Sequence, residues 1–153
     1  WAWNRADIKY DVKQDRVVFL IRNRKTDKIV GAVGRGLNKN VYPKWFMYGN
    51  KDVPFKCGDC DDAVIVEDCP SACAVSNVLT GISIMGTKLK EEHKKYLKPY
   101  KNLYICLDRD ATNKAYDMAK DLRSSGFDNV IVKPLEDDLK YFNTDQIKEM
   151  FYE

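Results

Sequence analysis

The sequence lacks several features that would assign it to common protein classes. Its longest apolar runs, such as residues 17–21 and 64–66, are as long as a β-strand and far shorter than the roughly 20 residues of a membrane helix. We therefore expect no transmembrane segment and no membrane partner. The chain has no internal repeat, no low-complexity tract and no Walker-type phosphate loop. Its single histidine, His93, lies in a charged stretch where we expect it to be exposed, and no Ser-His-Asp or Cys-His arrangement is supported.

The amino end also lacks an initiator Met and the apolar stretch of a signal peptide, so we expect the chain to be cut from a longer protein. The five cysteines are an odd number, which indicates free thiols in a reducing compartment and hence a cytoplasmic location. Cys57 with Cys60, and Cys69 with Cys73, have spacings that would suit structural zinc. Two different elements would have to converge for that, so small, partly buried cysteines are the favoured interpretation.

The net charge of +3 hides a strong asymmetry along the chain. Residues 1–56 carry 13 Lys+Arg against 5 Asp+Glu, and residues 57–153 carry 13 against 18. A basic part beside an acidic part is typical of a polyanion-binding surface next to a cation site, although an uneven solvated surface would have the same composition.

The first third of the sequence predicts short strands and loops. Residues 16–23 and 28–35 are β-branched and apolar and are separated by a short polar turn, which predicts a β-hairpin. Around them, Asn, Gly and Pro residues recur at short intervals and argue against helices.

From residue 63 onward, short strands alternate with segments of helical length. We expect strands at residues 63–66, 82–85, 103–107 and 129–132. We expect helices starting at Pro70, through residues 88–96, through the Ala115 to Leu122 stretch that ends at Gly126, and after Asn143, which Gln146 would help to cap. This alternation predicts an α/β fold with a parallel sheet and flanking helices, in which functional groups gather at the carboxyl ends of strands.

Three carboxylates occupy such positions. Glu67 follows the first of these strands, and Asp108 and Asp110 follow the third. Hard oxygen ligands of this kind suit Mg²⁺ or Mn²⁺, and phosphoryl transfer is the chemistry that such ions support. Acidic residues after strands are also common as solvated turns and helix caps, and Asp110 would serve as a cap for the next helix.

The sequence V-I-V-E-D (64–68), M-G-T (85–87) and L-D-R-D-A (107–111) resembles TOPRIM domains in order and spacing, over residues 63–142. This resemblance implies a Rossmann-like TOPRIM fold whose metal ligands are Glu67, Asp108 and Asp110. Asp137 and Asp138 correspond to the last acidic motif of the family and are further candidate ligands. The family commonly has Gly after the strand-end Glu and Asp four residues beyond it, where this chain has Asp68 and Ser71.

Four upstream blocks, at residues 16–23, 29–37, 42–46 and 55–58, resemble the basic lobe that precedes TOPRIM in bacterial and phage primases. The resemblance implies a groove for nucleotide and template lined by Arg22, Arg35, Lys44, Trp45 and Lys56. Cationic groups neutralise phosphates and an aromatic face stacks a base, which agrees with these residue types. Without the resemblance, solvated hairpin charges and a packing role for Trp45 would explain the same residues.

We therefore expect a primase catalytic core. A mainly β and loop lobe (residues 1–60) would bind template and nucleotide, a TOPRIM domain (61–143) would hold Mg²⁺ or Mn²⁺, and a helix (144–153) would follow. Single-stranded DNA, ribonucleoside triphosphates and a replicative helicase would be its partners. The alternatives are a TOPRIM nuclease, or an inactive primase-like DNA-binding domain of a replicative helicase.

Overall fold

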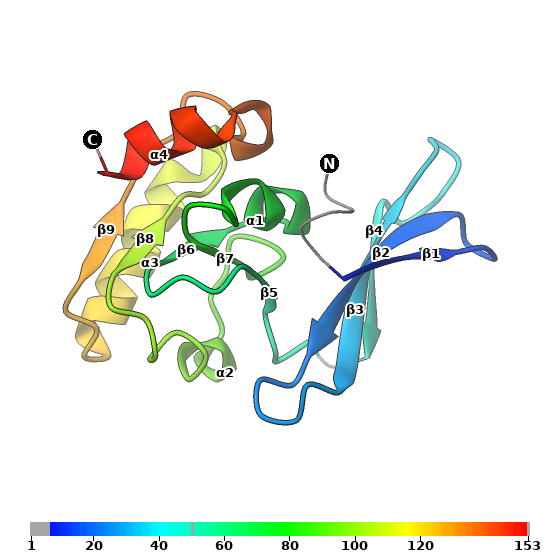
Figure 1. The fold of residues 1–153 in the computed structure, drawn as a ribbon, viewed down its shortest axis with the longest axis horizontal. Helices are drawn as coiled ribbons and strands as arrows, with labels where there is room; N and C mark the ends of the chain where they lie inside the picture. Colours follow the sequence, from blue (N-terminus) through cyan, green and yellow to red (C-terminus); the bar gives the residue numbers. More distant parts are fainter. Residues whose placement is uncertain (1–6, 50, 153) are drawn as a thin grey trace.

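The computed structural model of the protein describes residues 7–49 and 51–152 of the 153-residue chain (Figure 1). No helix in these residues is long and apolar enough to cross a membrane. The strands are β1 (Ile8–Asp11), β2 (Arg16–Arg22), β3 (Ile29–Gly36), β4 (Trp45–Gly49), β5 (Phe55–Cys57), β6 (Ala63–Val66), β7 (Thr80–Ser83), β8 (Leu103–Ile105) and β9 (Val130–Val132). The helices are α1 (Cys69–Val75), α2 (Glu91–Lys94), α3 (Thr112–Ser124) and α4 (Thr144–Tyr152), with 3₁₀ turns at Arg109–Ala111 and Leu139–Tyr141.

The first sheet is antiparallel, in the order β1-β2-β3-β4. The predicted hairpin is confirmed as the pair β2 and β3, which keep one register along most of their length. Side chains alternate between the two faces of a strand, so Phe19 and Ile21 point to the same side, where they are buried together with Val33 of β3.

The second sheet has the order β5-β7-β6-β8-β9. Strands β6 to β9 are mutually parallel and β5 is an antiparallel edge strand on β7, which confirms the expected α/β fold with a parallel sheet. The expected strand at residues 82–85 lies two residues earlier, as β7. Met85 has a positive φ of 56°, which an extended strand does not permit, so the strand ends before it.

Helices cover both faces of this sheet, as expected. Val64 and Val66 of β6 face the core cluster that includes α1 and α4, whereas Ile65 faces the opposite cluster, which includes α3. The predicted helix over Ala115 to Leu122 is α3, and Gly126 follows it with φ of 97°. The predicted cap of α4 is also present, since Asn143 Oδ1 accepts from the Gln146 N–H and Gln146 Oε1 accepts from the Asn143 N–H.

Helix α1 packs very closely on β7. A Cβ added at Gly81 would lie 2.2 Å from the carbonyl oxygen of Ala72 and 2.6 Å from its Cα. Only hydrogen at position 81 allows this approach, which seats α1 directly on the sheet beside the strand end that carries Glu67.

The two sheets share one core. Phe19 of β2 meets Phe55 of β5 edge to face, with ring centroids 5.7 Å apart, and both rings belong to the cluster that continues to α1 and α4. In Figure 1 the antiparallel sheet stands beside the α/β layers, and β5 lies on the side that faces it. The basic lobe is therefore fixed against the parallel sheet by apolar packing.

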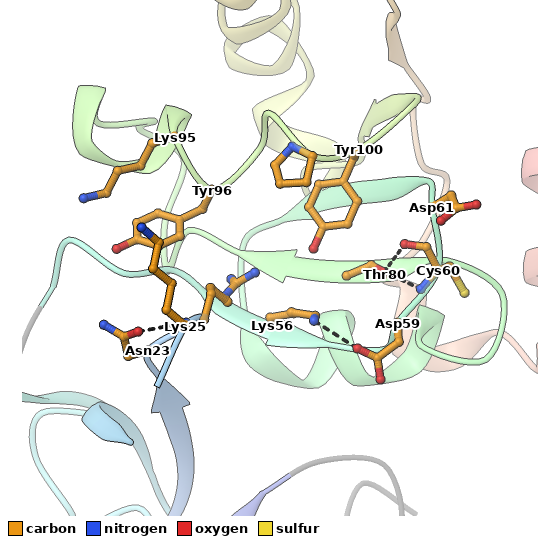
Figure 2. A pocket seen from close by; sticks show the side chains of 12 residues that line it. Asn23, Lys25, Lys56, Asp59, Cys60, Asp61, Thr80, Lys95, Tyr96 and Tyr100 are labelled. Atoms are coloured by element: carbon orange, nitrogen blue, oxygen red, sulfur yellow. Dashed lines mark hydrogen bonds and ion pairs between the residues drawn. The ribbon is translucent and has the colours of Figure 1, made fainter. Parts of the chain in front are cut away.

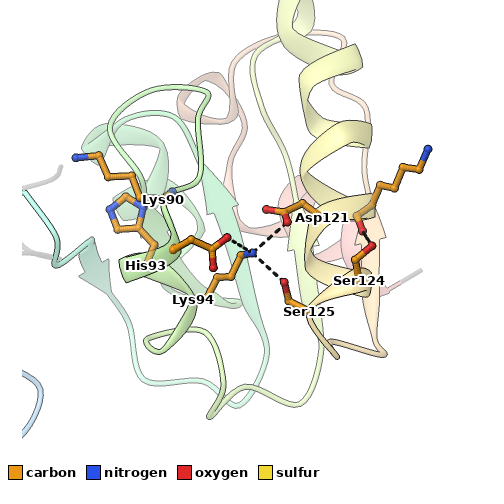
Figure 3. Close-up of polar contacts among 8 residues, drawn as sticks. Lys90, His93, Lys94, Asp121, Ser124 and Ser125 are labelled. Carbon is orange, nitrogen blue, oxygen red and sulfur yellow. Dashed lines mark hydrogen bonds and ion pairs between the residues drawn. The ribbon is translucent and has the colours of Figure 1, made fainter.

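Helix α2 is held in place by two buried polar side chains (Figure 3). Lys94 Nζ donates to Glu91 at 2.7 Å, to Asp121 at 3.1 Å and to Ser125 at 2.8 Å, which ties α2 to the end of α3. The expectation that His93 is exposed was wrong, because its side chain is among the most buried in the protein. Its Nδ1 accepts from the Lys90 N–H, its Nε2 lies 3.3 Å from the carbonyl oxygen of Lys51, and burial lowers its pKa.

Candidate active site

Two of the predicted carboxylates meet at neighbouring strand ends. Glu67 follows β6 and Asp108 follows β8, and these strands are adjacent and parallel. The Asp108 N–H donates a 3.0 Å hydrogen bond to Glu67 Oε1. Because parallel strands end at the same edge of a sheet, residues that are 41 positions apart in the sequence share one site.

A cleft of about 580 Å³ opens over these carboxylates. The parallel-sheet domain contributes four acidic side chains to its lining, and the antiparallel sheet contributes basic and aromatic ones. The acidic group consists of Glu67, Asp68, Asp108 and Asp138, and the opposing group consists of Arg35, Lys44, Trp45 and Phe46. The cleft therefore places a cluster of negative charge opposite a positively charged, aromatic wall.

The carboxylates in the cleft repel one another. The pKa of Glu67 is raised from 4.5 to about 7, chiefly by burial and further by the charges of Asp108 and Asp110. The pKa of Asp108 is also raised, by burial first and then by Asp138 and Asp68. A divalent cation between these groups would remove much of the repulsion.

The basic wall is built from paired residues of two strands. Arg35 of β3 lies opposite Trp45 of β4 in the sheet, and its guanidinium lies 5.0 Å from the centroid of the indole ring. Lys140, which sequence reasoning did not identify, also lines the cleft and lies 3.5 Å from Asp138. In the sequence, only its position directly after the last acidic motif, one residue beyond Leu139, pointed to a place at the site.

Arg16 supports this wall from behind. Its side chain is 1% exposed, and its Nη1 lies 3.4 Å from the carbonyl oxygens of both Gly34 and Lys44. Its guanidinium also lies 5.4 Å from the ring centroid of Phe46. Arg16 therefore holds the backbone immediately before Arg35 and before Trp45. The hydrophobic pattern of the sequence identifies Arg16 only as the first residue of a strand.

Four of the predicted site residues do not line the cleft. Asp110 and Asp137 are exposed, although the charge of Asp110 reaches Glu67. Arg22 and Lys56 line a separate depression, and each is paired with an acid, Arg22 with Asp7 at 2.7 Å and Lys56 with Asp59 at 3.0 Å.

The neighbouring turns fix the backbone around Glu67. The carbonyl oxygen of Glu67 accepts from Ser83 Oγ at 3.1 Å and from the Gly86 N–H at 3.0 Å. Asp68, which replaces the usual family Gly, caps α1 by accepting from the Ser71 N–H at 2.9 Å while it lines the cleft. The M-G-T turn and the start of α1 thus orient the acidic wall.

The carboxylates of the cleft fit a hard divalent cation whose coordination is completed by substrate and water. Within residues 7–49 and 51–152, no three His, Cys, Asp or Glu side chains are grouped closely enough to hold an ion by themselves. Mg²⁺ is commonly held by one or two carboxylates together with substrate phosphates and water, and the adjacent pair Glu67 and Asp108 matches that number of protein ligands. The cysteines offer no such set either, because among the described residues they are not grouped closely enough with one another, or with His, Asp or Glu, to hold an ion.

Comparison with known proteins agrees with this architecture. Residues 68–143 match the Toprim-like family, and TOPRIM domains generally bind divalent metal ions. Over 90% of its length the chain superposes on the crystal structure of the Aquifex aeolicus primase (zinc-binding and RNA polymerase domains), with a TM-score of 0.65 and 21% identity. The chain covers 37% of that primase chain. No curated protein matches the sequence significantly. Residues 68–143 are therefore a Toprim-like domain, and the chain as a whole has the fold of a TOPRIM-containing primase.

Proposed function

We propose that this protein is the catalytic core of a DNA primase, which synthesises short RNA primers on a single-stranded DNA template. The observation that carries this proposal is the cleft itself, in which Glu67 and Asp108 face Arg35, Lys44 and Trp45. A nucleotidyl transferase needs a site for metal-bound phosphates beside a surface that holds a polyanionic strand.

Glu67 and Asp108 would hold Mg²⁺ or Mn²⁺, with Asp138 and the exposed Asp110 and Asp137 available for a second ion. When bound, the ion would lower the pKa of the attacking 3′-hydroxyl and neutralise charge on the triphosphate. Asp138 and Lys140 both line the cleft, with the Asp138 carboxylate 3.5 Å from the Lys140 ammonium.

The opposing wall would bind and orient the substrates. Arg35 and Lys44 would pair with phosphates of the incoming nucleotide or of the template, and Trp45 would stack on a base. Arg16 would help to position these side chains, because its Nη1 lies 3.4 Å from the carbonyl oxygens of Gly34 and Lys44, next to Arg35 and Trp45 in the chain. Positioning and charge stabilisation would then supply most of the rate.

Arg22 and Lys56 stay candidates for template contacts outside the cleft. We further propose ribonucleoside triphosphates as substrates, a cytoplasmic location and a replicative helicase as the protein partner, since primers are needed where the duplex has been opened.

The test is template-dependent synthesis from single-stranded DNA and ribonucleoside triphosphates with Mg²⁺ or Mn²⁺. Labelled oligoribonucleotides that disappear when the metal is chelated would support the proposal. Shortened DNA in place of new RNA would identify a TOPRIM nuclease. Binding of DNA without either product would identify a DNA-binding domain that has no catalytic role.

A further inference from the structure

A second pocket lies away from the carboxylate cleft and shares no lining residue with it. Its volume is about 750 Å³, larger than that of the cleft. Its walls come from three parts of the chain, namely the turn after β2, the segment from β5 to β7, and the segment after α2 (Figure 2). We call this the second pocket.

Cationic side chains dominate the second pocket. Arg24, Lys25, Lys56 and Lys95 line it, against the acids Asp59 and Asp61. Lys56 is engaged by Asp59 at 3.0 Å. Among the described residues, Arg24, Lys25 and Lys95 have no carboxylate within ion-pairing distance, so their charges are available to an anionic ligand.

Two tyrosine rings accompany these charges. Tyr96 and Tyr100 lie on the wall opposite Lys25 and Lys56 (Figure 2). The guanidinium of Arg24 lies 5.4 Å from the ring centroid of Tyr96, and the ammonium of Lys95 lies 5.1 Å from it. Cations beside aromatic faces are the combination with which proteins bind phosphates and stacked bases of an unpaired strand.

Each wall of the second pocket is fixed by its own hydrogen bonds. Asn23 Oδ1 accepts from the N–H groups of Lys25 and Thr26, which shapes the turn after β2. Thr80 Oγ1 accepts from the Cys60 N–H and donates to the Cys60 carbonyl oxygen, both at 2.8 Å. Lys94 anchors the segment that carries Tyr96 (Figure 3). The pocket is therefore formed before any ligand binds, which lowers the entropic cost of binding.

We propose that the second pocket binds a segment of single-stranded nucleic acid, with phosphates on Arg24, Lys25 and Lys95 and bases against Tyr96 and Tyr100. The inference goes beyond the proposed polymerase chemistry and does not require it, because the second pocket contains none of the cleft carboxylates. The strand is template DNA or RNA product, which share this chemistry.

Charge reversal tests the proposal without touching the cleft. The variant Lys25→Glu/Lys95→Glu changes two exposed side chains, and Lys120→Glu/Lys148→Glu changes two exposed lysines of α3 and α4 with the same change in net charge. Binding of fluorescent oligo(dT) and oligo(U) of about 12 nucleotides is measured by anisotropy over a series of salt concentrations. Chelator is present and nucleoside triphosphates are absent, so catalysis plays no part in the result.

We expect the second-pocket variant to bind at least one of the two oligonucleotides roughly tenfold more weakly than the control variant. The slope of the logarithm of the binding constant against the logarithm of the salt concentration should also be smaller by about 1.4, since each of the two lost phosphate contacts contributes about 0.7 on a single strand. Greater loss for oligo(dT) identifies the template as the ligand, and greater loss for oligo(U) identifies the product. Equal affinity and slope in the two variants would overturn the proposal.

Cross-linking of the wild-type protein decides the matter if the charge-reversed variant does not fold. Irradiation with an oligonucleotide that contains 5-iodouracil attaches a base to a neighbouring aromatic ring, and mass spectrometry locates the adduct. An adduct on Tyr96 or Tyr100 supports the proposal, and adducts found only elsewhere, for example on Trp45, refute it. If primer synthesis fails while this adduct forms, the proposed function is wrong and the second binding site stands.

Discussion

Replacement of Glu67 by Gln should stabilise the metal-free protein at alkaline pH. Burial and the charges of Asp108 and Asp110 raise the pKa of Glu67 from 4.5 to about 7, so the folded protein binds this proton more tightly than the unfolded chain does. Stability is therefore lost as the pH rises from 4.5 through 7. Gln keeps the size of the side chain and the oxygen that accepts from the Asp108 N–H, but removes the charge.

The raised pKa sets the size of the effect. Full conversion of this pKa difference would give about 3 kcal/mol. Glu67 is only half-buried, so solvent screening reduces this value, and we expect a gain of roughly 1–2 kcal/mol for Glu67→Gln at about pH 8. At about pH 4 the gain should vanish, because Glu67 is then protonated in both the folded and the unfolded state.

Urea unfolding in the presence of chelator measures this difference, with Glu149→Gln as the control, since Glu149 is an exposed carboxylate on α4. The control should change the free energy of unfolding by less than 0.5 kcal/mol, the usual limit for surface substitutions. Addition of Mg²⁺ should then stabilise the wild type and the control more than Glu67→Gln. If Glu67→Gln is as stable as the wild type or less stable at alkaline pH, the carboxylates of the cleft do not repel one another as inferred.

Three further substitutions test other parts of the structure. Asp108→Ala should abolish metal-dependent synthesis and leave single-strand binding intact in an anisotropy assay; loss of binding would show that Asp108 is structural. Gly81→Ala should cost about 3 kcal/mol and lower the melting temperature by roughly 10 °C, because its Cβ would overlap the backbone of Ala72, and an unchanged melting curve would contradict that packing. Arg16→Met should cost about 1–3 kcal/mol, because the hydrogen bonds of the buried guanidinium to Gln14 and to the carbonyl oxygens of Gly34 and Lys44 are lost. It should also weaken nucleotide binding more than Lys148→Met, an exposed control. Equal nucleotide affinity in these two variants would exclude a positioning role for Arg16.

Local patterns in the sequence predicted the hairpin, the alternation of strands and helices after residue 63, and the helix α3, but they gave no positions for β1, β4 and β5. Two β-branched, apolar runs on either side of a short polar turn gave the hairpin of β2 and β3, and helical spacing gave α3, because burial selects such apolar patterns in each element separately. The predicted position of β7 was two residues too far along the chain, because the apolar pattern carries no sign of the left-handed backbone at Met85. His93 was misjudged because its partners, Lys51 and Lys90, satisfy it inside a stretch that is charged on average.

The acidic half of the candidate site followed from strand order, since Glu67 and Asp108 end adjacent parallel strands. The basic half depended on how the two sheets pack. Arg35, Lys44 and Trp45 reach the cleft, whereas Arg22 and Lys56 lie elsewhere, and no local pattern separates these two groups. Lys140 and Arg16 escaped notice for the same reason, because their roles arise from contacts between elements far apart in the sequence.

The packing of Phe19 against Phe55 has a consequence for how the protein can move and how it can be divided. A hinge motion between the two sheets would break apolar contacts of their shared core. We therefore expect adjustment to a substrate to come from long side chains that line the cleft, such as Lys44 and Lys140. Cutting the chain after residue 60 would keep Phe19 with Phe55 but would remove β5 from the edge of the parallel sheet, and apolar residues of the shared core would be exposed on each piece. The fragment 61–153 produced alone should therefore aggregate, or remain loosely ordered, even though it includes the whole Toprim-like segment, residues 68–143.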